Sequence, residues 1–126
     1  MVSLFPCPCC GFSVHENPPG SHGVCPVCFW EDDAVQLRWP KFSGGANKNS
    51  LYDAQRKYVE IKASDHRFVD KVISDFSCQE KEPGWRLIDF SIDNFEESNR
   101  EGEWPIEKVK LYWWRDSFWR SCRDNC

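Results

Sequence analysis

The sequence predicts an α+β protein in which a small zinc ribbon is joined to two or three helices and a short antiparallel sheet. Two cysteine pairs with matching spacing lie in the first 28 residues and indicate the ribbon. Farther along, several segments repeat apolar residues at the helical period, and others alternate apolar and polar residues as a half-buried strand does. A chain of 126 residues has the length of one domain, or of a small module with an extension.

The cysteine pairs supply the donors of a metal site. The four candidate ligands are Cys7, Cys10, Cys25 and Cys28. Four thiolates are the number and type of donor that a tetrahedral structural zinc site requires. A proline follows the first cysteine of each pair, and the intervening residues 11–24 leave room for a short strand and a turn. We therefore expect one structural zinc ion.

Three further side chains leave alternatives open at this site. Cys9 is a third thiol within the first pair, and it becomes a spare thiol, packed or exposed, if Cys7 and Cys10 are the ligands. His15 and His22 lie between the pairs, and either could replace a cysteine as a ligand. The matched spacing of the two pairs favours the four-cysteine set.

Two disulfides are the other chemistry open to four cysteines. Residues 1–5 carry no basic residue and no long apolar run, so they do not indicate a secretory signal. We expect a cytoplasmic protein, and in a reducing cytosol closely spaced cysteines are more often metal ligands than disulfides.

Composition argues against two classes of protein. No apolar run approaches the roughly 20 residues that cross a bilayer, so we expect no membrane segment. The net charge is −4, and neither residues 1–50 nor residues 51–126 have a basic excess, so a nucleic-acid partner is not favoured. An acidic chain with seven tryptophans suits another protein as its partner, and a basic one above all.

An aromatic and acidic run follows the last cysteine directly. Its candidate partner-binding residues, an aromatic anchor beside an acidic patch, are Trp30, Glu31, Asp32 and Asp33. The alternative is structural: Phe29 and Trp30 cover the zinc site, and the acids form a solvated turn. The residues alone leave both interpretations open.

Local signals predict the elements of the N-terminal half. Residues 11–14 alternate as a short strand, and residues 17–20, with two prolines and a glycine, form a turn. A loop over residues 39–47 precedes a helix whose N-cap is Ser50. The apolar face of this helix consists of Leu51, Ala54, Tyr58 and Ile61.

The C-terminal half is predicted to hold a second helix and a strand. A helical stripe follows Asp65 and runs to Phe76, where apolar residues recur every three or four positions. A turn lies at residues 83–84, and residues 88–92 then alternate apolar and acidic or hydroxyl side chains as a strand does.

Residues 106–120 fit two structures. Pro105 is a good first residue for a helix, and the length of the segment favours that choice, although its first half also alternates as a strand does. Trp113 and Trp119 either lie deep in the fold or contact a partner, and we count both as candidate partner-binding residues. The remaining cysteines have irregular spacing and are expected to be free thiols: Cys78, Cys122 and Cys126.

These elements divide the chain into two parts. Residues 1–62 form the ribbon module with its following helix, and residues 63–126 form an aromatic-rich extension packed into the same compact domain. The chain has no glycine-rich phosphate loop and no arrangement of cysteine, histidine and carboxylate that indicates a nucleophile. A zinc ion held by four cysteines has no open position for water, so we expect no enzyme activity.

Three runs carry a resemblance to a known family: Pro6-Cys7-Pro8-Cys9-Cys10-Gly11, Cys25-Pro26-Val27-Cys28-Phe29-Trp30-Glu31-Asp32-Asp33 and Gly44-Gly45-Ala46-Asn47-Lys48-Asn49-Ser50-Leu51. Over about residues 5–60 the chain resembles the cysteine-rich CPCC family of small bacterial proteins. The resemblance implies an association with bacterial toxin–immunity loci. It therefore implies a zinc-binding, non-catalytic interaction module, an immunity protein that neutralises a bacterial toxin, with a basic toxin domain as partner. The alternative is a zinc-ribbon nucleic-acid-binding or transcription-associated factor, which the missing basic surface disfavours.

Overall fold

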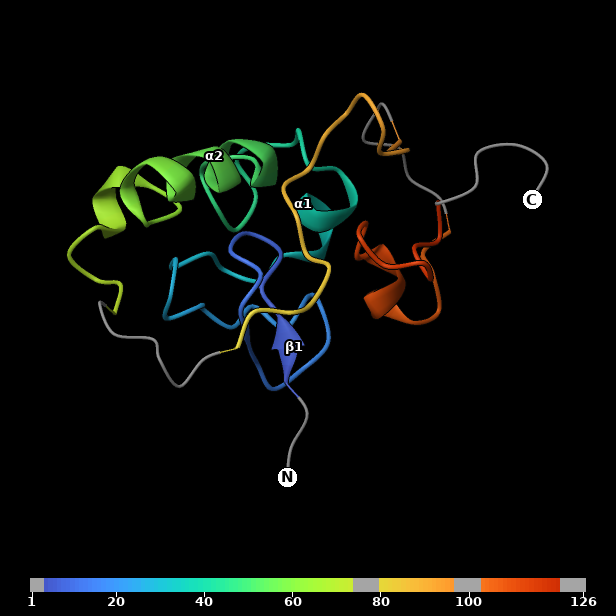
Figure 1. The fold of residues 1–126 in the computed structure, drawn as a ribbon, viewed down its shortest axis with the longest axis horizontal. Coiled ribbons are helices and arrows are strands. Elements are labelled where there is room, and N and C mark those ends of the chain that lie inside the picture. The colour runs from blue at the N-terminus through green and yellow to red at the C-terminus, as the bar shows by residue number, and fades with distance from the viewer. Residues whose placement is uncertain (1–3, 74–79, 97–102, 121–126) are drawn as a thin grey trace.

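The computed structural model describes residues 4–73, 80–96 and 103–120. The strands in this part of the chain are β1 (Phe5–Pro6) and β2 (Ser13–His15), and the α-helices are α1 (Ala34–Arg38) and α2 (Leu51–Ile61). Two 3₁₀-helices follow, η1 (His66–Phe68) and η2 (Lys108–Leu111). The predicted fold class is confirmed: this is a small α+β fold (Figure 1) with a short antiparallel sheet. It also contains a four-cysteine cluster.

The two strands form a hairpin around the first cysteine pair. β1 and β2 pair antiparallel, with Phe5 opposite His15. The strand predicted over residues 11–14 corresponds to β2, although β2 begins two residues later, at Ser13. The amide of Ser13 donates to the carbonyl of Glu80 at 2.7 Å, so a segment far along the chain lies beside the hairpin.

Helix α2 confirms the predicted helix and its cap. The Ser50 hydroxyl accepts a hydrogen bond from the Asp53 amide at 3.1 Å, which satisfies one of the free amides of the first turn. The helix ends at Lys62, which takes the left-handed conformation that often terminates helices. Its inner face consists of Leu51, Ala54, Gln55 and Tyr58, all of them buried.

Helix α1 has no counterpart among the predicted elements. The Asp33 carboxylate caps it by accepting hydrogen bonds from the amides of Val35 at 2.8 Å and Gln36 at 3.2 Å. The interpretation of residues 31–33 as a solvated turn is therefore wrong, since Asp32 and Asp33 are buried. A helix of five residues is too short to show a helical repeat, which is why periodicity did not indicate it.

Two predictions for the C-terminal half are wrong. The helix predicted after Asp65 is only the three residues of η1, followed by turns, and residues 74–76 of that prediction lie outside the described residues. The strand predicted over residues 88–92 is irregular backbone that ends in a turn at residues 90–92. There the Asp93 carboxylate accepts from the Asp89 amide at 2.8 Å, so an acidic side chain takes up an amide that a strand would pair across a sheet.

The segment over residues 106–120 is neither the long helix nor the strand that the pattern allowed. It contains η2 and a series of turns. The physical reason lies in three consecutive buried residues, Leu111, Tyr112 and Trp113. Successive side chains of an α-helix point about 100° apart, so a regular helix on this surface would bury one stripe and not three neighbours in a row.

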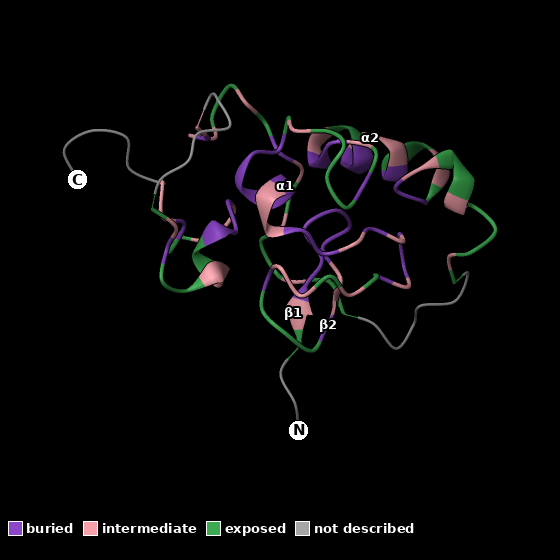
Figure 2. Cartoon of the chain, turned by 180° about the vertical axis from the view of Figure 1, so that it is seen from behind, coloured by how far each residue is buried: buried purple, intermediate pink, exposed green. Residues whose placement is uncertain are grey.

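Buried side chains from both halves of the chain form one hydrophobic core. Figure 2 shows the buried residues concentrated where the loops around β1, helix α1 and the inner side of α2 meet. The longest helix among the described residues is α2, with 11 residues, and none of them has the length and apolar character that crossing a bilayer requires.

A buried arginine joins the two halves. The Arg38 guanidinium donates to both oxygens of Glu96, at 2.9 and 3.1 Å. Its other surfaces contact the rings of Trp39, Trp104 and Trp119, whose centroids lie 4.4 to 4.7 Å from the guanidinium carbon. Such a paired and stacked arginine is far less costly to bury than an isolated charge. The boundary predicted at residue 62 stays a prediction, but these contacts cross it.

Candidate metal centre

Four cysteine sulfurs converge in the centre of the fold. The sulfur atoms of Cys7, Cys10, Cys25 and Cys28 all lie within 4.8 Å of one another, and all four side chains are fully buried. Two contacts cross between the loops, with Cys7 Sγ 3.6 Å from Cys28 Sγ and Cys10 Sγ 3.7 Å from Cys25 Sγ.

These distances fit a metal site better than disulfides. A tetrahedral zinc ion with Zn–S bonds of about 2.3 Å places its sulfurs about 3.8 Å apart. A disulfide brings two sulfurs to about 2.05 Å. The observed separations of 3.6 and 3.7 Å are therefore close to the edge of a ZnS₄ tetrahedron, and the donor set fits a zinc ion.

The two cysteine loops have the same backbone structure. The amide of Gly11 donates to the carbonyl of Cys7 at 2.7 Å, and the amide of Phe29 donates to the carbonyl of Cys25 at 2.7 Å. In each loop the amide of the first cysteine then donates to the residue five positions later, at 2.8 and 2.9 Å. Gly11 and Phe29 both have positive φ, +84° and +69°. Equal spacing in the sequence has thus produced two matching metal-binding knuckles.

The first knuckle is covered by an indole from the C-terminal half. A Cβ atom on Gly11 would lie 2.5 Å from Cδ2 of Trp85, so only glycine allows this ring to pack on the backbone there. The indole N–H of Trp85 donates to the Pro8 carbonyl at 3.2 Å. The same carbonyl accepts from the Gln55 side chain at 2.9 Å, which connects the knuckle to helix α2.

The second knuckle is covered differently. Phe29 takes the position of Gly11 and keeps a left-handed backbone that is uncommon for a bulky residue. Its ring packs on Phe68 of η1, with the ring centroids 4.9 Å apart. The Cys28 carbonyl accepts from the Ser64 amide at 2.8 Å, so the segment after α2 closes over this knuckle.

Burial dominates the electrostatics of the cluster. It raises the pKa of the Cys7, Cys10 and Cys28 thiols well above the usual thiol value. At Cys25 burial acts in the same direction, but hydrogen bonds with the other three thiols outweigh it and lower the pKa. Because four buried thiolates are costly without a positive charge among them, the cluster suits a divalent cation that displaces the thiol protons.

The other possible ligands named from the sequence lie outside this cluster. Cys9 is fully buried, so the spare thiol is packed and not exposed, and it is not one of the four converging sulfurs. His15 is buried at the end of β2. His22 is exposed, and its Nδ1 lies 3.2 Å from the Glu31 carboxylate. Cys78, Cys122 and Cys126 lie outside the described residues.

The candidate partner-binding residues are mostly inside the protein. Trp30, Asp32, Asp33 and Trp113 are exposed by 6% or less. Glu31 is half-buried, and Trp119 is half-buried against the Arg38 and Arg120 guanidinium groups. The acidic patch inferred from three neighbouring acids is therefore wrong as a surface feature, because only Glu31 of the three reaches solvent.

The two buried acids instead bind backbone amides and a hydroxyl. Asp32 accepts from the Ser21 hydroxyl at 2.7 Å and from the Ser21 amide at 3.2 Å. Asp33 caps α1 with one oxygen and accepts from the Ala46 amide with the other, at 2.9 Å. A Cβ atom on Gly45 would lie 2.7 Å from the same Asp33 oxygen, so the glycine lets the loop approach the carboxylate.

Two amide side chains that sequence reasoning missed complete this network. The Gln36 amide donates to the carbonyls of Phe42, Asn47 and Asn49 at 3.0 to 3.1 Å. The Asn47 side chain accepts from the Glu31 amide and donates to the Glu31 carbonyl, both at 2.8 Å. These two residues join the acidic run to the glycine loop. The only sequence signal for them was their position in or near the runs that carry the family resemblance.

The structure thus defines a small α+β protein with a buried four-cysteine metal-binding cluster. The model of one family, described as cysteine-rich CPCC, matches residues 5–79, which is more than half of the chain. The chain belongs to this family, and the match extends beyond the predicted end at about residue 60. No curated protein matched the sequence.

Proposed function

We propose that the four-cysteine cluster holds one zinc ion and that this ion is structural. The observation that carries the proposal is the complete burial of all four sulfurs, which lie within 4.8 Å of one another. Four thiolates fill the coordination shell of zinc and leave no position for water or substrate, so the ion would stabilise the two knuckles and take no part in a reaction. In a small fold, such a site supplies folding free energy directly.

Native mass spectrometry of reduced, freshly purified protein tests this proposal, with one zinc per chain as the expected result. Cys7→Ser should lower the zinc content, and addition of a strong chelator should unfold the wild type. Protein that is folded, reduced and free of zinc would refute the proposal.

We further propose that the protein is a non-catalytic protein-interaction module, an immunity protein that neutralises a bacterial toxin. The family resemblance, the net charge of −4 and the abundance of tryptophan support this proposal. A basic toxin domain remains the partner that the net charge favours. A local acidic patch does not support this proposal, because Asp32 and Asp33 are buried.

Growth rescue tests this second proposal. The protein is co-expressed with the toxin candidate encoded beside it, and wild type should restore growth and co-elute with the toxin. Cys7→Ser is the matched control, since it keeps the chain but removes a metal ligand. Absence of both rescue and complex formation would refute the immunity role. Binding to DNA or RNA at low salt would instead support the nucleic-acid alternative, which no basic patch in the sequence favours.

A further inference from the structure

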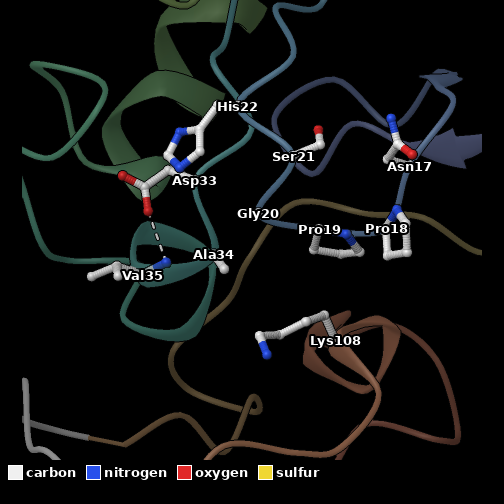
Figure 3. Close-up of a pocket in the computed structure, with 10 residues that line it drawn as sticks. All are labelled: Asn17, Pro18, Pro19, Gly20, Ser21, His22, Asp33, Ala34, Val35 and Lys108. Atoms are coloured by element: carbon white, nitrogen blue, oxygen red, sulfur yellow. Dashed lines mark hydrogen bonds between the residues drawn. The ribbon is translucent and has the colours of Figure 1, made fainter.

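An open groove lies between the ribbon module and the C-terminal half (Figure 3). Its volume is about 620 Å³, within the usual range for ligand sites. One wall is the loop over residues 17–22, the second is the beginning of α1, and the third is Lys108 of η2. Figure 3 shows Lys108 opposite the proline pair, with its side chain running toward the α1 side of the groove.

The floor of the groove is apolar and tightly supported. Pro19 is buried, and Pro18, Ala34 and Val35 line the groove around it. Gly20 has a φ of +94°, and a Cβ atom there would lie 3.2 Å from Cβ of Ala34. The loop therefore rests directly on α1, and the apolar floor is a preformed surface.

The walls carry polar groups that the fold does not use. Among the described residues, no hydrogen bond involves the side chain of Asn17, which is exposed. No described carboxylate lies within ion-pair distance of Lys108. Its Nζ lies 5.4 Å from the ring centroid of Trp104. The Asp33 carboxylate at the edge is already engaged as the cap of α1.

We propose that this groove binds an extended segment of a partner protein that carries an apolar side chain and a carboxylate. The apolar side chain would lie on the floor of Pro18, Ala34 and Val35. The carboxylate would pair with the Lys108 ammonium, which has no carboxylate partner in the part of the chain that the structure describes. The exposed Asn17 side chain would bond the backbone of the segment.

This inference rests on the proposed interaction role, and it adds the surface that determines which partner the protein binds. The floor and the loop wall belong to the stretch that the family model matches, residues 5–79, whereas Lys108 lies beyond it. The groove thus combines a wall from the family module with a charge from the chain's own extension. A change of side chain at position 108 would change the charge required of the partner without altering the module.

The experiment uses the full-length, zinc-loaded protein and a phage-displayed library of random peptides. Selected peptides should contain Asp or Glu beside an apolar residue, and binding is then measured by fluorescence anisotropy. Lys108→Glu should weaken binding at least about tenfold, because it replaces a charge-assisted pair by a repulsive one. Lys110→Glu is the matched control: it lies in the same 3₁₀-helix, is exposed and does not line the groove, so it should bind as wild type does.

Two further measurements keep the result decisive. A peptide with Lys in place of its acidic residue should bind Lys108→Glu better than it binds wild type. Equal zinc content and circular dichroism of both lysine variants would show that folding is unaffected. Selected peptides without acidic residues, or equal losses in the two variants, would overturn the groove assignment. If Lys108→Glu rescues growth from the toxin as well as wild type does, the groove assignment is overturned and the immunity role stands. If wild type shows neither rescue nor complex formation, only the immunity role is refuted.

Discussion

Gly11→Ala tests whether the Trp85 indole packs directly on the first cysteine knuckle. The new methyl group would lie 2.5 Å from Cδ2 and 2.8 Å from Cγ of Trp85, inside the contact distance of real Cβ atoms. The indole must therefore move, and its 3.2 Å hydrogen bond to the Pro8 carbonyl would be strained or lost. The displacement acts on a loop that carries two of the four cysteines.

The expected magnitude has two parts. Any residue other than glycine at φ +84° costs roughly 1–2 kcal/mol of backbone strain. Displacement of a packed ring from a core usually adds about 1–3 kcal/mol. The free energy of unfolding should therefore fall by about 2–5 kcal/mol, and zinc should dissociate faster from the variant.

Urea unfolding at a fixed zinc concentration, followed by tryptophan fluorescence, measures this change. Gly84→Ala is the matched control, because Gly84 has a φ of +86° but nothing within 4 Å of an added Cβ atom. Gly84→Ala should lower the free energy of unfolding only by the backbone strain. In a Trp85→Ala background the cost of Gly11→Ala should fall to that same value. Equal losses for the two glycine variants in the wild-type background would refute the packing argument.

Three further predictions concern the metal, the α1 cap and pH. Cys7→Ser should lose zinc, whereas Cys9→Ser should keep one zinc per chain by mass spectrometry, because Cys9 is not among the four converging sulfurs. Asp33→Ala should lower the free energy of unfolding by about 1–3 kcal/mol in the same urea assay, since it removes the α1 cap and the acceptor of the Ala46 amide. Burial alone would raise the pKa of Glu96, but hydrogen bonds from Arg38 and Arg120 lower it below the ordinary value of a glutamic acid. The stability that Glu96 contributes is present above that ordinary pKa and is lost as the pH falls through the lowered pKa. Glu96→Gln should therefore flatten the acid limb of stability in a pH series, and an unchanged limb would contradict this.

The metal cluster and the groove should respond differently to substitution. The cluster holds the two knuckles together, and the loop over residues 17–22 that forms one groove wall is the connection between those knuckles. Loss of the metal should therefore disturb the groove, whereas a change at Lys108 should leave the metal in place. This asymmetry separates a binding defect from a folding defect in any variant.

Features that depend on neighbouring residues followed from the sequence alone. The metal ligands Cys7, Cys10, Cys25 and Cys28 were predicted because two residues between thiols shape a metal-binding loop wherever it lies. Helix α2 was predicted because Ser50 caps it and its apolar face repeats over three turns. In both cases the signal and the structure lie within one short segment.

Features that depend on distant contacts were decided by the tertiary structure. The acids after the second knuckle looked exposed, but Asp33 meets a loop amide 13 residues later and Asp32 meets Ser21, 11 residues earlier. The run around Trp113 looked helical, but it takes an irregular path that buries three successive side chains. Whether a charge or an indole is buried depends on which partners the rest of the chain brings to it, and that pairing is absent from any local pattern. The same holds for the groove, whose apolar floor and single lysine come from segments more than 70 residues apart.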